Sequence, residues 1–150
     1  IMIIDAGIRD NVTFLLEEAS YKIILPFYKN PRADQIETKT SPDDFVTLAD
    51  IRAEVFISEA LMKLIENSKV IGEEASSEDK NYRASLTREF VWTVDPIDGT
   101  KNFINGNECF CSMIALLNYG KVVASWIYIP NSAVCYFADK QGVQIKYKNS

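Results

Sequence analysis

Two carboxylates three positions apart, Asp95 and Asp98, stand in the segment Trp92-Thr-Val-Asp-Pro-Ile-Asp-Gly-Thr100. The apolar residues ahead of Asp95 predict a buried strand that delivers both acids into a tight turn, and Pro96 stiffens that turn because its ring fixes φ. Mg²⁺ requires near-octahedral oxygen coordination, and a rigid pair of carboxylates loses little entropy on binding it. The main-chain carbonyl of Ile97 offers a further hard oxygen. The segment therefore predicts a site for divalent cations.

The residues that follow could bind an anion. Asp98-Gly99-Thr100 is expected to form a turn that opens a short helix, where unpaired N–H groups and the helix dipole favour a phosphate. Gly99 has no Cβ to obstruct close approach, and the Thr100 hydroxyl can cap the helix and polarise a neighbouring water. Carboxylates and a phosphate repel each other in one pocket unless divalent cations lie between them. The two halves of the segment together predict metal-assisted phosphoryl chemistry.

Each acidic group also has a purely structural interpretation. An isolated Asp98 before Gly-Thr is more often a helix cap than a ligand, and an isolated Glu73-Glu74 pair is more often solvated surface charge. Asp50 is explained by a capping box with Thr47 at the start of a helix. Lys101 is a surface cation that could steer anions. The order of the motifs along the chain is what favours the functional interpretation.

That order resembles the inositol monophosphatase family of Mg²⁺-dependent, lithium-sensitive phosphatases. The matching segments are Ser41-Pro-Asp-Asp-Phe-Val-Thr-Leu-Ala-Asp50, Gly72-Glu73-Glu74, Asp95-Pro-Ile-Asp98-Gly-Thr100 and Asn102-Phe103-Ile104. The Asp-Pro-Ile-Asp-Gly-Thr signature is highly specific, and the resemblance runs from the first predicted helix to the strands after Gly120. It implies the layered α/β sandwich of that family, whose members are commonly cytoplasmic homodimers acting on small phosphorylated metabolites.

Carried over by position, the resemblance implies a set of metal ligands. Glu73, Asp95 and the Ile97 carbonyl would bind one Mg²⁺ ion, and Asp95 and Asp98 would help to bind a second. Two or three ions are implied in all.

The same resemblance implies the catalytic and substrate-binding groups. Glu73 and Thr100, with Asp50 behind Thr100, would orient and deprotonate the attacking water. The amides of Gly99 and Thr100 would hold the phosphate, and Asp98 would lie at the substrate.

The sequence also departs from the family pattern. The family has a further metal-binding aspartate in a Trp-Asp-x-Ala-type motif, and this sequence has no candidate after Val143. We therefore expect residues 1–150 to be the amino-terminal part of such a domain, with the carboxy-terminal part not in this chain. Lys101 stands where the inositol-specific branch usually has threonine, and residues 105–110 differ from the usual His-Gly-aromatic-Pro pattern. These departures leave the substrate open.

The preferred function is hydrolysis of a small phosphate monoester, such as inositol monophosphate, by metal-activated water. The first alternative is a 3′(2′),5′-bisphosphate nucleotidase or histidinol-phosphatase of the same superfamily, which Lys101 favours. The second alternative is a non-catalytic metal-binding module.

Composition limits other functions. The 150 residues suffice for about one domain, carry a net charge of −5 and contain no histidine. The lack of imidazole excludes a Ser-His-Asp triad and a Cys-His dyad within these residues. The acidic balance argues against nucleic acid as a partner, and no apolar run approaches the ~20 residues of a membrane span.

The cysteines and the amino terminus suggest a location. Cys109, Cys111 and Cys135 lack the spacing of a zinc site or a disulfide framework, so we expect buried, unreactive thiols. No secretory leader is visible, and the expected location is the cytoplasm.

The elements that must position these residues follow from hydrophobic periodicity. Apolar residues at spacings of three and four predict a helix from Ile4 to Ile23, ended or kinked at Pro26, and a second helix from near Thr47 to near Asn67. Strands are predicted at residues 70–71, 90–94, 112–118, 122–129 and 133–138, and loops at 29–44 and 75–88. The predicted fold class is α/β, with two amino-terminal helices packed on a mainly antiparallel sheet.

Overall fold

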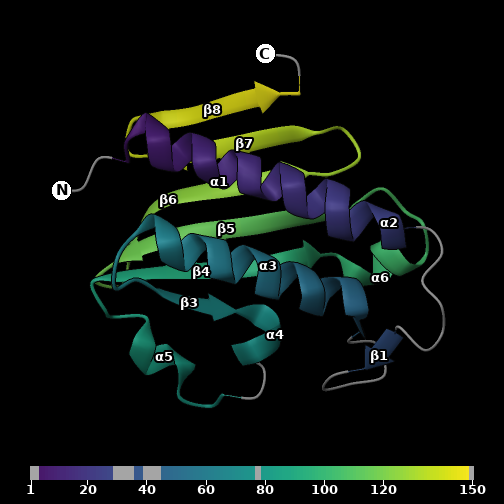
Figure 1. Ribbon diagram of the computed structural model, residues 1–150, viewed down its shortest axis with the longest axis horizontal. Coiled ribbons are helices and arrows are strands. Elements are labelled where there is room, and N and C mark those ends of the chain that lie inside the picture. The colour runs from purple at the N-terminus through teal and green to yellow at the C-terminus, as the bar shows by residue number, and fades with distance from the viewer. Residues whose placement is uncertain (1–3, 29–35, 39–44, 77–78, 149–150) are drawn as a thin grey trace.

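The computed structural model describes residues 4–28, 36–38, 45–76 and 79–148. Two long helices lie side by side across one face of a six-stranded sheet (Figure 1). This arrangement confirms the predicted fold class. Most of the predicted loop at 29–44, including the part of the first motif at 41–44, lies outside the described residues.

The first helix, α1 (Ala6–Ala19), begins where the Asp5 side chain accepts a hydrogen bond of 2.8 Å from the backbone N–H of Ile8. The helical path then continues through a π-helical turn, η1 (Ser20–Ile24), into α2 (Leu25–Phe27). The sequence predicted an end or a kink at Pro26. The widened turn stands just before that proline, which has no N–H to donate to the preceding turn.

The second long helix, α3 (Leu48–Leu64), has the predicted capping box: Thr47 and Asp50 exchange side-chain and backbone hydrogen bonds. It ends at Leu64, slightly before the predicted end near Asn67. Ahead of it lies a small antiparallel ribbon of β1 (Ile36–Thr38) and β2 (Phe45–Thr47), which the sequence analysis did not predict. The ribbon leads directly into the capping residue of α3.

The large sheet keeps its strands in chain order. These strands are β3 (Lys69–Gly72), β4 (Phe90–Asp98), β5 (Cys111–Asn118), β6 (Lys121–Ile129), β7 (Val134–Asp139) and β8 (Gly142–Tyr147). Only the β3–β4 pair is parallel among these neighbours, because the chain crosses over between them. That crossover contains α4 (Glu73–Ser76) and α5 (Tyr82–Ser85), where only a loop was predicted. The last strand, β8, was also not predicted.

The main core forms between the two long helices and the sheet. Aromatic rings anchor it on the sheet side: the centroids of Trp92 and Trp126 are 6.0 Å apart, and those of Trp126 and Phe137 are 5.1 Å apart. Fully buried Leu16 and Ile57 pack onto the same cluster from α1 and α3. Burial of side chains of this size contributes about 1.5–3 kcal/mol each.

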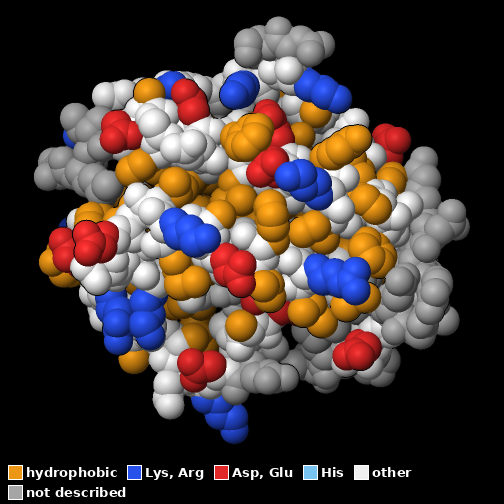
Figure 2. Space-filling model, in the orientation of Figure 1, with side chains coloured by type: hydrophobic (Ala, Val, Ile, Leu, Met, Phe, Trp, Pro, Cys, Tyr) orange, Lys and Arg blue, Asp and Glu red, His pale blue; other side chains and the backbone are white. Residues whose placement is uncertain are grey.

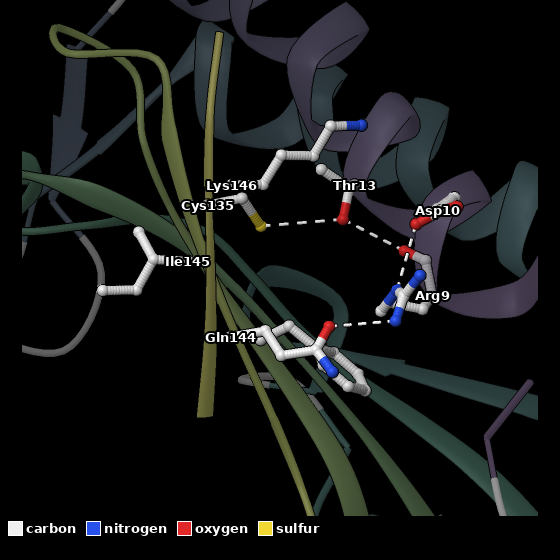
Figure 3. A pocket seen from close by; sticks show the side chains of 8 residues that line it. Arg9, Asp10, Thr13, Cys135, Gln144, Ile145 and Lys146 are labelled. Atoms are coloured by element: carbon white, nitrogen blue, oxygen red, sulfur yellow. Dashed lines mark hydrogen bonds and ion pairs between the residues drawn. The ribbon is translucent and has the colours of Figure 1, made fainter. Parts of the chain in front are cut away.

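Arg9 ties α1 to the far strands of the sheet. Its Nη1 donates to Gln144 Oε1 at 2.9 Å, and its backbone carbonyl accepts from Thr13 Oγ1 at 3.0 Å (Figure 3). The same carbonyl accepts from Trp126 Nε1 at 3.2 Å. A cavity of about 350 Å³ lies here between α1, β7 and β8, and none of the predicted site residues lines it.

The surface over the two long helices is chemically mixed. Lys and Arg side chains alternate there with Asp, Glu and exposed hydrophobic groups instead of forming one basic stripe (Figure 2). No helix in the described part of the chain is long and apolar enough to cross a membrane.

The three cysteines differ in burial. Cys135 is buried, and burial raises the pKa of its thiol, as expected for an unreactive group. Cys111 is partly buried, and desolvation raises its pKa to about 11. Cys109 is exposed, so the expectation of a buried thiol is wrong there. It lies in the loop before β5, outside the packed strands.

Candidate active site

The predicted cation segment lies where β4 meets β5. Asp95 pairs with Met113, whereas Asp98 pairs with Cys111, so β4 has one extra residue between the two acids. The bulge contains Pro96, which cannot donate to the ladder, and the Pro96 carbonyl instead accepts from Ser112 Oγ at 2.7 Å. Asp95 was predicted at the end of its strand. The strand instead continues through this bulge to Asp98.

Asp95 is the most strongly perturbed acid of the site. Burial raises its pKa to about 8, assisted by a hydrogen bond with Glu73 and by the negative charges of Glu73, Asp98 and Asp50. Its Oδ1 atom is buried and has no hydrogen-bond partner. A buried carboxylate oxygen without a donor is costly, and a cation would satisfy it.

Thr100 and Asp50 are 50 residues apart in the sequence, but their side chains form a hydrogen bond. Thr100 Oγ1 lies 3.1 Å from Asp50 Oδ1 and 3.0 Å from the Ile97 carbonyl, so its single proton is directed at these acceptors. Asp50 is fully buried, which raises its pKa, while hydrogen bonds from Thr47 and Thr100 oppose that rise. The Thr100 oxygen therefore keeps lone pairs with which it can accept a hydrogen bond from water.

Gly99 begins the short helix α6 (Thr100–Ile104) with a φ of 87°. A Cβ at this position would lie 2.8 Å from the Cys109 carbonyl oxygen, so the loop returning to β5 requires glycine here. Gly99 holds the capping position of this helix and has no side chain with which to cap it. The interpretations of Asp98 and of the Thr100 hydroxyl as helix caps are therefore wrong.

Glu73 opens α4 immediately after β3, and its side chain forms a hydrogen bond with Asp95. The residue that fixes this segment is Glu54, which the sequence analysis missed. Glu54 is 6% exposed, and its carboxylate accepts from the backbone N–H groups of Glu74 at 2.7 Å and Ala75 at 2.9 Å. Its signal was present in the sequence, because an acid four residues after Asp50 falls on the buried face of the helix.

The arrangement can be tested for its fit to magnesium. Among the described residues, no three Asp, Glu or Cys side chains are gathered closely enough to form a metal site as they stand. The structure does bring Glu73 against Asp95, and Asp98 is near enough for its charge to raise the pKa of Asp95. The unpartnered Asp95 oxygen and this all-oxygen donor set fit a hard cation such as Mg²⁺.

A cavity of about 290 Å³ opens beside Glu73 and Asp95. Its other walls are formed by the α5 side chain Tyr82 and by Thr93 and Met113, which face away from the helix layer. The carboxylates therefore border a space large enough for a small molecule.

The sequence of this chain is similar to those of known proteins. The model of the inositol monophosphatase family matches residues 9–149. The fructose-1,6-bisphosphatase/inositol-1-monophosphatase of Aquifex aeolicus is 30% identical over 125 residues, which are 79% of this chain and 45% of that protein. The 3′(2′),5′-bisphosphate nucleotidase CysQ of Haemophilus influenzae is 31% identical over 132 residues, which are 85% of this chain and 46% of that protein.

Solved structures give the same result. Inositol monophosphatase II of Staphylococcus aureus MSSA476 matches with a TM-score of 0.73 and 27% identity, over 97% of this chain and 49% of that chain. Structures of SaIMPase-II bound to inositol monophosphate and to 2′AMP match with TM-scores of 0.68 and 0.71, at 26% and 27% identity. They cover 93% of this chain and 46% and 48% of theirs.

The chain spans less than half the length of these two curated relatives. Within that span, however, the family model covers nearly every residue of the chain. This chain belongs to the inositol monophosphatase family.

Proposed function

We propose that the protein containing this chain is a Mg²⁺-dependent phosphatase that hydrolyses a small phosphate monoester. The observation that carries the proposal is the environment of Asp95, a partly buried carboxylate beside Glu73 with one oxygen that has no donor. Only a cation makes that arrangement favourable with a phosphate nearby. Membership of the inositol monophosphatase family supports the same chemistry.

The side chains of Glu73, Asp95 and Asp98 and the Ile97 carbonyl would hold the ions, two or three in number. When bound, Mg²⁺ supplies charge neutralisation for the phosphate and lowers the pKa of water. Side chains and backbone amides of the protein would orient the water, remove its proton and bind the phosphate.

Thr100 would orient the attacking water. Its hydroxyl proton is directed at Asp50 and at the Ile97 carbonyl, so its oxygen can only accept from an incoming water. Glu73, which contacts Asp95, would assist in removing the water proton. The amides of Gly99 and Thr100 at the start of α6 would bind the phosphate oxygens.

Inositol monophosphate is the first substrate to test. Structures of SaIMPase-II contain either inositol monophosphate or 2′AMP, which supports a small phosphorylated metabolite without choosing between a sugar and a nucleotide. The similarity to a 3′(2′),5′-bisphosphate nucleotidase, together with Lys101, favours a nucleotide phosphate as the second candidate. The homodimer and the cytoplasmic location stay predictions.

The test uses the complete protein and a panel of inositol monophosphate, adenosine 3′,5′-bisphosphate and histidinol phosphate. We expect phosphate release that requires Mg²⁺ and is inhibited by Li⁺. Asp95→Asn should abolish turnover and leave the circular dichroism spectrum unchanged. A parent protein that binds Mg²⁺ but releases phosphate from none of these compounds would instead be a metal-binding module.

A further inference from the structure

Glu54 lies outside every motif used so far, yet it contacts the segment that presents Glu73. Its carboxylate comes from the buried face of α3 and reaches the start of α4, which packs against α3 and β4 (Figure 1). One oxygen accepts from the N–H of Glu74 at 2.7 Å and the other from the N–H of Ala75 at 2.9 Å. Both amides belong to the first turn of α4, where no helical acceptor is available.

The Glu54 carboxylate packs directly against Gly72. A Cβ on Gly72 would lie 2.1 Å from Glu54 Cδ and 2.3 Å from one of its oxygens. A serine or an aspartate at position 72 could cap α4 with its own side chain. The Glu54 carboxylate occupies the space that such a side chain would need. A residue on a different helix thus performs the capping, and glycine at position 72 makes room for it.

We propose that Glu54 is a positioning residue that holds Glu73 in place for metal binding and water activation. This inference rests on the proposed function. Glu73 is exposed and opens a four-residue helix, too short to be stable alone. Two charge-assisted hydrogen bonds to the residues directly after it fix its backbone and hence the direction of its side chain toward Asp95.

Substitution by glutamine separates this role from simple packing. Glu54→Gln keeps the size of the side chain but retains only one acceptor oxygen, while its NH₂ group faces the second amide donor. The matched control is Glu59→Gln, the same change at an exposed position of the same helix. Both variants are made in the complete protein and compared well below their unfolding temperatures.

We expect Glu54→Gln to weaken Mg²⁺ binding by roughly 10-fold or more, as measured by calorimetry with Mg²⁺ alone. In turnover assays the Mg²⁺ concentration for half-maximal rate should rise by a similar factor, and kcat at saturating Mg²⁺ should recover to within about twofold. Glu59→Gln should change neither quantity. A variant with parental Mg²⁺ affinity would overturn the role of Glu54, whereas a parent without phosphatase activity would overturn only the proposed function.

Hydrogen exchange tests the same contact without a variant. In the Mg²⁺-free parent protein, the amides of Glu74 and Ala75 should already exchange slowly, because Glu54 accepts from both before any ion binds. Rapid exchange at these two amides would refute the inference even if Glu54→Gln failed to fold. In a folded Glu54→Gln variant, exchange at one or both amides should accelerate about 10-fold.

Discussion

Replacing Asp95 by Asn tests whether the proximity of the acids at the carboxyl ends of β3 and β4 destabilises the metal-free protein and is relieved by a cation. The carboxylate is partly buried, adjoins Glu73 and has one oxygen with no donor. Asparagine has nearly the same shape, carries no charge and can donate a hydrogen bond to Glu73. The substitution should therefore stabilise the metal-free protein while it removes a metal ligand.

The magnitude follows from the environment of Asp95. Burial and the neighbouring acids raise its pKa from 3.8 to about 8, so the folded state retains a proton that the unfolded chain has released. This penalty is absent below pH 3.8 and grows as the pH rises toward 8. It corresponds to at most about 5 kcal/mol at pH 8, and solvent screening of a partly exposed carboxylate reduces the expected gain for Asp95→Asn to about 1–2 kcal/mol.

The assay is urea unfolding of the complete protein at pH 8, with EDTA and with about 10 mM Mg²⁺. In EDTA, Asp95→Asn should unfold at the higher urea concentration. With Mg²⁺ the order should reverse, because the parent gains binding free energy that the variant lacks. Asp10→Asn, at an exposed aspartate on α1, serves as the control and should respond to Mg²⁺ like the parent. An Asp95→Asn protein less stable than the parent in EDTA would refute the reasoning.

Substitutions at Thr47, Gly99 and Thr100 test the scaffold and the groups that orient the attacking water, with Gly142→Ala and Thr100→Ser as matched variants. Thr47→Ala removes the hydroxyl from the capping box of α3 and should cost about 1 kcal/mol in thermal or urea unfolding. Gly99→Ala adds a Cβ 2.8 Å from a carbonyl oxygen at positive φ and should cost more than about 2 kcal/mol, whereas Gly142→Ala, with positive φ but open space, should cost about 1 kcal/mol. Thr100→Val should lower kcat by roughly 100-fold and, because it removes a donor from the buried Asp50 carboxylate, should cost about 1–3 kcal/mol in unfolding. Thr100→Ser should retain most of the activity and stability; equal rates for the two variants would argue against a role for the hydroxyl.

The sequence predicted the elements whose hydrophobic pattern is strong. The strands around Trp92 and Trp126 and the helix after Thr47 were found because their apolar residues follow one regular period. Strand β8 was missed because all six of its residues are exposed, so no buried face marks it in the sequence. The ribbon of β1 and β2 was missed because each strand has only three residues, too few to show a regular period.

Some features of the candidate site could be predicted from the sequence, and others could not. The pairing of Asp50 with Thr100 followed from the family resemblance, and the structure places their oxygens 3.1 Å apart. The bulge that separates Asp95 from Asp98 could not be predicted, because it depends on how β4 pairs with β5. Sequence spacing locates a residue along its own strand but does not specify its neighbours across the sheet.

Helix α3 links the two sides of the site. Asp50 uses one carboxylate oxygen to accept from Thr47 at the start of the helix and the other to contact Thr100. Glu54, one turn later on the same buried face, holds the segment that carries Glu73. The segment that carries Thr100 and the segment that carries Glu73 are thus both held by hydrogen bonds to one helix. A change that rotates α3 about its axis should therefore disturb the water-orienting and metal-binding groups together, and the spacing of four residues between Asp50 and Glu54 is what keeps both in register.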